Sequence, residues 1–66
     1  MFGVNMRNLR ESLALSREEL ALRLNTSEMM IAHYENGVKV PSMAVAYEIS
    51  VALGTTVNQL INGTAE

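Results

Sequence analysis

The stretch REELALRLNTSEMMIAHYENG, residues 17–37, decides the fold of this chain of 66 residues. Its first half has the pattern of a short helix. Ser16 can cap the N-terminus of that helix, and Glu19 completes a capping box with it. Asn25 follows, and asparagine tolerates the left-handed backbone conformation that ends a helix sharply. A helix is therefore predicted over residues 17–24.

The second half of the stretch predicts another short helix after a tight turn. Thr26 and Ser27 are both competent N-caps, and Asn36-Gly37 is a strong turn signal. A second helix is therefore predicted over residues 28–35. Two helices that cross steeply through so short a turn leave little room, and Ala21 supplies a small side chain there. The expected inner positions of the two helices are Leu20, Ala21, Leu24, Ile31 and Tyr34.

One helix is predicted before this stretch and two after it. The helix before it spans residues 4–14, with Met6, Leu9 and Leu13 on one face at helical spacing. A loop follows the stretch because Pro41 biases the residue before it away from helix. The chain therefore leaves the stretch through a loop and not through a longer helix.

The two helices after the loop are predicted over residues 43–53 and 56–61. Ser42 caps the first of them, and Gly54 stops it at a position where glycine costs little. Thr56 opens the second with another capping box, and a turn signal ends it. The expected core positions of the first helix are Val45, Ile49, Ala52 and Leu53.

Length and composition favour one compact all-α domain over residues 1–66, with residues 64–66 as a flexible tail. The apolar share is 48%, mostly aliphatic residues and methionine, which favours helices packed on helices. The chain contains no cysteine, so disulfides and thiolate metal sites are excluded. Its single histidine also argues against a structural zinc site.

Membrane and enzyme functions are not expected. No apolar run approaches the roughly 20 residues of a membrane span, and no charged leader precedes an apolar region. We therefore expect a cytoplasmic protein. The sequence has no nucleophile–base pair, no phosphate-binding glycine loop and no evident carboxylate cluster. Neither catalysis nor a cofactor is expected, and no small-molecule ligand is evident.

The charge of the chain is acidic in sum but uneven along its length. The net charge is −2 and the pI is about 5.3, whereas nucleic-acid binders usually have a basic balance because phosphate neutralisation drives their affinity. Four of the five basic residues, however, lie within the first 23 positions. The basic residues are Arg7, Arg10, Arg17, Arg23 and Lys39.

Several short motifs follow one another in order along the chain. They are Leu9-Arg10, Leu15-Ser16-x-Glu18-Glu19-Leu20-Ala21, Ile31, Tyr34-Glu35-Asn36-Gly37, Pro41-Ser42, Ala52-Leu53-Gly54 and Val57-Asn58-Gln59-Leu60. With these motifs the chain resembles the Cro/C1-type (XRE-like) helix-turn-helix family, most closely phage repressor and Cro DNA-binding domains. The resemblance covers nearly all of residues 6–63. It implies a compact five-helix, lambda-repressor-like domain whose second and third helices form the helix-turn-helix, and double-stranded DNA as the partner.

The resemblance also implies roles for individual residues. Arg10 and Glu35 match a pair that often forms a salt bridge between the first and third helices. Two departures from the family pattern lie nearby: Asn25 replaces a common glycine, and Glu28 and Met29 replace polar or basic residues. The positions that usually face bases are Ser27, Glu28, Met29 and His33, with Met30 beside them. The candidate phosphate contacts are Arg17, Asn36, Lys39 and Arg10.

Arg17 and Glu28 each have more than one interpretation. Arg17 is either a solvated residue or a phosphate contact, and phosphate is favoured because a cation at a helix N-terminus opposes the helix dipole. Glu28 suits that dipole without any partner, accepts from cytosine N4, or repels phosphate at wrong sites. The dipole interpretation of Glu28 is favoured, and it is compatible with the cytosine contact.

The remaining outward residues also leave alternatives open. Neighbouring residues of a helix cannot both face inward, so Met30 is expected to lie partly against the core and Met29 to be exposed. Met29 then packs on thymine methyl groups or belongs to a protein interface. His33 is solvated or locally bonded, or it contacts a phosphate or a base with some pH sensitivity.

The leading interpretation is a sequence-specific DNA-binding transcriptional regulator, a small repressor that binds a palindromic operator through its third helix in the major groove. A weak or DNA-assisted homodimer would place two such helices about 34 Å apart. The alternative is a protein-interaction module, an antirepressor or antitoxin-like subunit, that uses the surface of Glu28, Met29 and Met30. The residues Val57, Leu60 and Ile61 are expected first of all to be core residues that close the bundle. The family resemblance also implies that the surface around them supplies the dimer contact.

Overall fold

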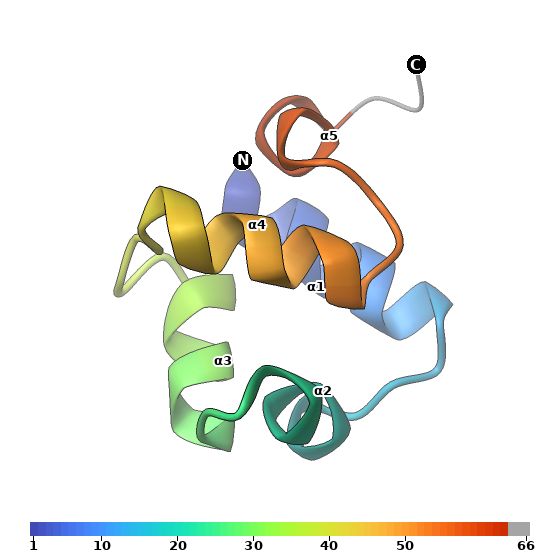
Figure 1. The fold of residues 1–66 in the computed structure, drawn as a ribbon, viewed down its shortest axis with the longest axis vertical. Helices are drawn as coiled ribbons and strands as arrows, with labels where there is room; N and C mark the ends of the chain where they lie inside the picture. The colour runs from blue at the N-terminus through green and yellow to red at the C-terminus, as the bar shows by residue number, and fades with distance from the viewer. Residues whose placement is uncertain (64–66) are drawn as a thin grey trace.

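The computed structural model describes residues 1–63, and these form five helices joined by turns and short loops, with no strand among them (Figure 1). This is the all-α, five-helix fold that the sequence predicts. The predicted flexible tail, residues 64–66, lies outside the described residues. The helices are α1 (Phe2–Ser12), α2 (Arg17–Leu24), α3 (Glu28–Glu35), α4 (Met43–Ala52) and α5 (Val57–Asn62).

The bounds of α1 differ most from the prediction. The helix begins at Phe2, before the expected start, and ends at Ser12, before the expected end. Ala14 adopts a left-handed backbone conformation with φ 58°, so the helix cannot continue through it. Leu13, predicted inside the helix on one face with Met6 and Leu9, is instead the C-cap residue and is 49% exposed, whereas Met6 is fully buried.

The early start of α1 depends on Gly3. A Cβ atom at this position would lie 2.6 Å from the carbonyl oxygen of Tyr34 and would clash with that of Glu35, and both oxygens belong to the C-terminal end of α3. A residue without a Cβ atom allows the two backbones to approach this closely. The first turn of α1 therefore packs directly on the end of α3.

The caps and the turn of the decisive stretch form as predicted. Glu19 N donates to Ser16 Oγ at 3.0 Å, and Ser16 N donates to Glu19 Oε1 at 2.8 Å, which completes the capping box of α2. Asn25 ends α2 in the left-handed conformation, with φ 56°. Ser27 caps α3, because its Oγ accepts from Met30 N at 3.1 Å. α2 and α3 therefore meet through a short turn with both helix ends satisfied.

The last two helices lie within one residue of their predicted bounds: α4 ends one residue early, and α5 begins and ends one residue late. α4 ends at Ala52, and Leu53 is its buried C-cap residue. α5 begins at Val57 because Thr56 is the N-cap, whose Oγ1 accepts from Gln59 N at 3.1 Å. The predicted cap of α4 is also present, since Ser42 Oγ accepts from the backbone at the start of that helix.

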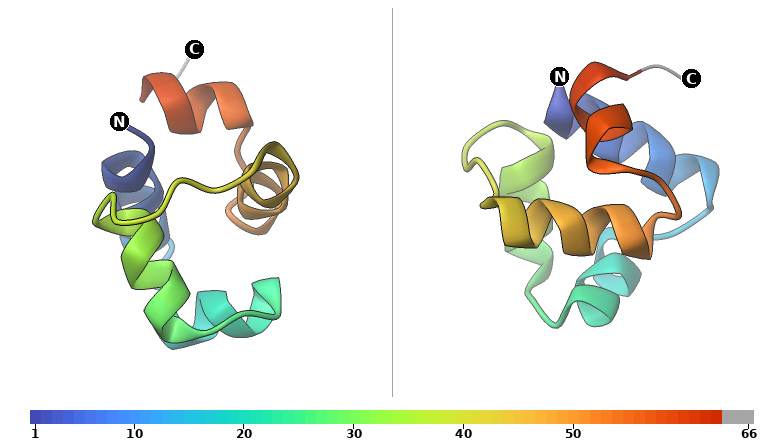
Figure 2. Two further views of the ribbon diagram at one scale, coloured as in Figure 1. Left: turned by 90° about the vertical axis from the view of Figure 1, so that its left-hand side faces the viewer. Right: turned by 45° about the horizontal axis from the view of Figure 1, so that its top comes forward.

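One core holds the bundle together, and each helix contributes a fully buried large side chain to it. α2 packs on α3 and α4, while α1 packs on α3 and α5. In both turned views α2 and the start of α3 lie at one end of the molecule, and α5 lies at the other (Figure 2). None of the five described helices combines the length and apolarity of a bilayer-spanning segment. The five buried side chains are Met6, Leu20, Ile31, Ile49 and Leu60.

Candidate nucleic-acid interface

The corner between α2 and α3 is closed by a small side chain and a backbone hydrogen bond. Ala21 is only 4% exposed at the crossing of the two helices. Its carbonyl oxygen accepts from Thr26 N at 2.9 Å, just after the left-handed Asn25. These contacts set the direction in which α3 leaves the turn, as a helix-turn-helix requires.

A buried ion pair ties α3 to α1. Arg10 Nε donates to Glu35 Oε2 at 2.6 Å, and Arg10 Nη2 donates to Glu35 Oε1 at 3.2 Å. The side chain of Glu35 has no exposed surface. The hydrogen bond with Glu35 raises the pKa of Arg10 above its ordinary value, against the opposing effect of burial. The ion pair that the family resemblance implied is confirmed.

Burial also bears on the expected phosphate contact of Arg10. Only 9% of its side chain is exposed, and its Nη1 donates to the carbonyl oxygen of Leu15 at 2.8 Å. A guanidinium that is bonded on three of its nitrogens inside the protein has little surface left for DNA. Arg10 therefore has the structural role that the family's salt-bridge pair implied, and we do not assign a phosphate contact to it.

Arg17 joins the same carboxylate from a third helix, which the sequence analysis did not anticipate. Its Nε donates to Glu35 Oε1 at 3.1 Å from the first residue of α2. About a third of the Arg17 side chain, 34%, remains exposed. Glu35 thus links α1, α2 and α3, and it holds Arg17 in place at the N-terminus of α2. We call this group of Arg10, Arg17 and Glu35 the Glu35 node.

The outward side of α3 carries the predicted base-reading residues. Glu28 is exposed, and the side chain of Met29 is 67% exposed. Met30 is half-buried, but it is not among the partly buried apolar residues that pack against the core of the described chain. The hydroxyl oxygen of Ser27 caps the helix, although the residue itself is exposed. His33 is partly buried.

The loop after α3 folds back on the end of that helix. Val38 N and Lys39 N both donate to the carbonyl oxygen of His33, at 2.9 and 3.2 Å. Gly37 allows this turn because it adopts a φ of 77°. Asn36 and Lys39, the predicted phosphate contacts of this loop, are both exposed. Asn36 directly follows Glu35, the last residue of α3, and Lys39 lies three residues further along the loop.

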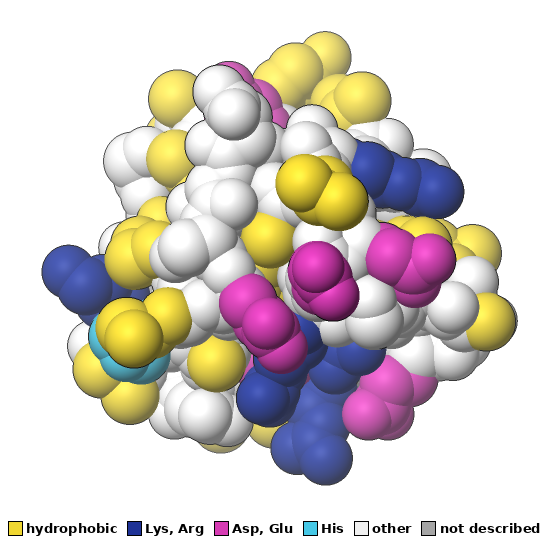
Figure 3. All heavy atoms as spheres, turned by 90° about the horizontal axis from the view of Figure 1, so that it is seen from below, with side chains coloured by type: hydrophobic (Ala, Val, Ile, Leu, Met, Phe, Trp, Pro, Cys, Tyr) yellow, Lys and Arg dark blue, Asp and Glu magenta, His cyan; other side chains and the backbone are white. Residues whose placement is uncertain are grey.

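The end of the molecule that carries α2 and the start of α3 has a mixed charge. Figure 3 views the molecule from this end, and basic side chains lie there among acidic and apolar ones. The surface is therefore not the uniformly basic patch of a non-specific DNA binder. Any DNA contact made here would depend on individual residues more than on overall attraction.

The predicted dimer contacts on α5 divide into two kinds. Leu60 is fully buried because it is the residue through which α5 enters the core. It has no surface for a second copy, so that expectation is corrected. Val57 is half-buried and Ile61 is 51% exposed.

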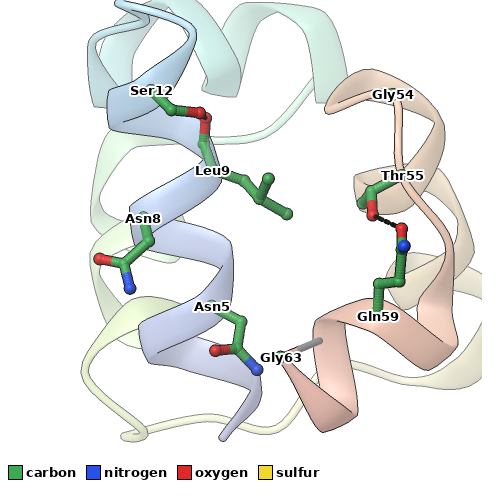
Figure 4. A pocket seen from close by; sticks show the side chains of 8 residues that line it. All are labelled: Asn5, Asn8, Leu9, Ser12, Gly54, Thr55, Gln59 and Gly63. Carbon is green, nitrogen blue, oxygen red and sulfur yellow. Dashed lines mark hydrogen bonds between the residues drawn. The ribbon is translucent and has the colours of Figure 1, made fainter. Parts of the chain in front are cut away.

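A hollow of about 520 Å³ lies between α1, α5 and the turn that precedes α5 (Figure 4). None of the described residues that line it has a titratable side chain. Its polar groups bond within the protein in part, since Asn5 Nδ2 donates to Leu60 O at 2.7 Å and Thr55 Oγ1 donates to Gln59 Oε1 at 2.6 Å. Residues 1–63 also contain no group of acidic, histidine or cysteine side chains that could hold a metal ion. The hydroxyl groups of Ser12 and Thr55 that line the hollow therefore have no titratable side chain beside them among the described residues of that lining.

Comparison with known proteins agrees with this geometry. The family model described as helix-turn-helix matches residues 6–60, from within α1 to α5. An uncharacterized HTH-type transcriptional regulator of Sinorhizobium fredii, y4dJ, is 30% identical over 66 residues, which make up all of this chain and 86% of that protein. The chain therefore belongs to the Cro/C1-type (XRE-like) helix-turn-helix family of DNA-binding transcriptional regulators.

Proposed function

We propose that this regulator is a small repressor that inserts α3 into the major groove of a palindromic operator. The observation that carries the proposal is the contrast between the two sides of α3. Ile31 and the Glu35 node hold its inner side, while Glu28 and Met29 are exposed near its N-terminus. In helix-turn-helix docking, the N-terminal residues of the second helix of the motif contact base edges. The inner side of α3 is therefore fixed by contacts with other helices, and its outer side is exposed where it would meet the bases.

Phosphate contacts are assigned to residues at the two ends of the motif. Arg17 at the start of α2 pairs with Glu35 through its Nε atom and keeps about a third of its side chain exposed, so we assign this exposed part to a phosphate. Asn36 and Lys39 are exposed in the loop after α3. Such contacts position a protein on the duplex and carry no sequence information of their own.

Base contacts are assigned to the exposed residues at the start of α3. An ionised carboxylate only accepts hydrogen bonds, so Glu28 suits the N4 amino group of cytosine. The thioether side chain of Met29 suits the methyl group of thymine. Ser27 and His33 flank these two residues and complete the proposed reading surface.

A palindromic operator requires two copies of the chain related by a two-fold axis, with their recognition helices about 34 Å apart. Val57 and Ile61 lie one helical turn apart on α5 and retain surface, so we assign the dimer contact to them. This surface is small, and the dimer would be completed on DNA. The repressor would act in the cytoplasm by occluding the operator.

A protein-interaction module is the second candidate. The exposed thioether of Met29 favours it, because methionine is common at adaptable protein-binding surfaces. The family assignment and the position of Arg17 favour DNA. Purification with a partner protein, without retention of any DNA, would support this second candidate.

The proposal is tested by binding to mixed genomic fragments at increasing salt concentration. We expect a subset of fragments to be retained, with an affinity that falls steeply as salt rises because phosphate contacts release counterions. Retention of all fragments alike would indicate non-specific binding and would contradict an operator-binding repressor. Retention of no fragment at low salt would contradict DNA binding through this surface.

A further inference from the structure

The ring of His33 is placed asymmetrically on α3. Its Nδ1 atom is buried and has no hydrogen-bond partner among the described residues. The side chain as a whole is only partly buried, and the histidine is visible at the surface in Figure 3. Nδ1 is therefore enclosed, whereas Nε2 is not among the buried side-chain atoms without a partner in the described residues, and we assign it to the solvent side of the ring.

This asymmetry decides which nitrogen of the neutral ring carries the hydrogen. Neutral imidazole has one N–H donor and one acceptor nitrogen. A buried N–H group without an acceptor is among the rarest defects of folded proteins, and an unpaired acceptor is tolerated more often. The hydrogen is therefore on Nε2, and Nδ1 keeps the enclosed lone pair.

We propose that His33 acts as a hydrogen-bond donor of fixed direction, whose Nε2–H binds an acceptor atom on DNA. This inference rests on the proposed operator binding, and it specifies that in one of its contacts the protein is the hydrogen-bond donor and DNA the acceptor. In the major groove the acceptors are purine N7, guanine O6 and thymine O4, whereas the amino groups of cytosine and adenine are donors and are rejected. A phosphate oxygen is the other acceptor on the duplex.

The position of His33 relative to its neighbours adds to the specificity. Met29 lies four residues earlier on the same face of α3, and Glu28 lies at the start of the helix. The outward side thus presents an acceptor, an apolar group and a donor in succession. Such a surface would distinguish base pairs by the positions of their hydrogen-bond donors and acceptors. It needs no basic side chain at positions 28 and 29, where this chain has Glu28 and Met29.

The first test measures the tautomer of the protein without DNA. The chain has a single histidine, so ¹⁵N-labelled histidine gives one pair of ring-nitrogen resonances. At a pH where the ring is neutral, we expect Nε2 to resonate as a protonated nitrogen and Nδ1 as a lone-pair nitrogen. Resonances that are averaged between the two forms, or a protonated Nδ1, would overturn the inference.

The second test uses two amide variants that mimic opposite ring nitrogens. The side-chain amide of His33→Gln reaches the place of Nε2, whereas that of His33→Asn reaches only the place of Nδ1. We expect the glutamine variant to keep operator affinity and the asparagine variant to lose about tenfold. Thermal unfolding of both variants is the control for folding.

The outcomes distinguish a base acceptor from a phosphate acceptor. They also distinguish failure of the role of His33 from failure of the repressor proposal. A loss confined to sequences with one particular base pair identifies a base acceptor, and an equal loss on all sequences identifies a phosphate. Equal binding by the glutamine and asparagine variants, with intact wild-type binding, overturns the role of His33 and leaves the repressor proposal standing. Absence of wild-type binding overturns both.

Discussion

The two sides of α3 obey different constraints. The inner side carries Ile31 and Glu35, which are buried and contact other helices, and the outer side carries Glu28 and Met29, which are exposed. Residues of the inner side must satisfy packing and buried charge within one chain. Residues of the outer side are free to match a partner. The inner side therefore explains the fold, and the outer side carries the residues to which the DNA contacts are assigned in the proposed function.

The largest effect is expected from Glu35→Gln, which breaks the inner side. Removing the carboxylate charge leaves the buried guanidinium of Arg10 with only the exposed carboxylate of Glu11, at 3.9 Å, as a counter-ion among the described residues, and the free energy of unfolding should fall by about 3 kcal/mol. Urea denaturation measures this change. The matched change on the outer side, Glu28→Gln, should alter it by no more than about 0.5 kcal/mol. Similar losses for both variants would contradict the distinction between the sides.

Arg17→Ala tests a residue of α2 that pairs with Glu35 on the inner side of α3 and is also assigned to a DNA phosphate. Because one phosphate contact is removed, binding to all DNA sequences should weaken alike, and the slope of log affinity against log salt should decrease by about 1. Stability should fall by less than about 1 kcal/mol, since the pair with Glu35 is partly exposed and Arg10 still compensates the carboxylate. Arg7→Ala on α1 is the control, because Arg7 is exposed and pairs with Glu11. A loss that depends on sequence would contradict the phosphate assignment of Arg17.

Met29→Ala tests whether the outer side of α3 recognises thymine. If Met29 packs on a thymine methyl group, replacement of that thymine by deoxyuridine should weaken wild-type binding by about fourfold, the value of one buried carbon. The variant should bind the two DNA molecules equally. Fluorescence anisotropy with both duplexes measures the difference. Equal binding of the two duplexes by the wild-type protein would remove Met29 from thymine recognition.

The smallest effect concerns pH and the capping box of α2. The hydrogen bond from Ser16 N, followed by that to the Ser16 side chain, lowers the pKa of Glu19 from its ordinary value of 4.5. A carboxylate with a lowered pKa stabilises the folded state above the ordinary value, and this contribution disappears as pH falls through the lower pKa of the folded protein. Glu19→Gln should therefore reduce the unfolding temperature at pH 6, and the difference from the wild type should disappear as pH falls below the lowered pKa of Glu19 in the folded protein. A constant difference between the two proteins over this range would contradict the assignment.

Local signals in the sequence were sufficient for much of the inner side. Ser16 with Glu19 specified a capping box, and Asn25 specified a left-handed helix end, because each depends on a few neighbouring residues. Leu13 was misplaced because no local signal indicates that Ala14 turns left-handed. Leu60 was expected in the core and is buried there, but helical spacing alone did not show that this burial leaves it no surface for a dimer contact.

Contacts between distant segments were harder to predict. The bond from Arg17 to Glu35 depends on the crossing of α2 and α3, which residue spacing does not specify. The close approach of Gly3 to the end of α3 depends in the same way on tertiary geometry. The enclosed Nδ1 of His33 is a third case, since its burial follows from packing and not from its position on the helix.

The central claim is that the outer side of α3 reads a DNA sequence. Selection of bound sequences from a random pool of duplexes tests it most directly, because binding, half-site and spacing are measured together. We predict enrichment of a motif with two inverted half-sites whose centres are about 34 Å apart. A pool that remains as random after selection as before it would contradict the claim.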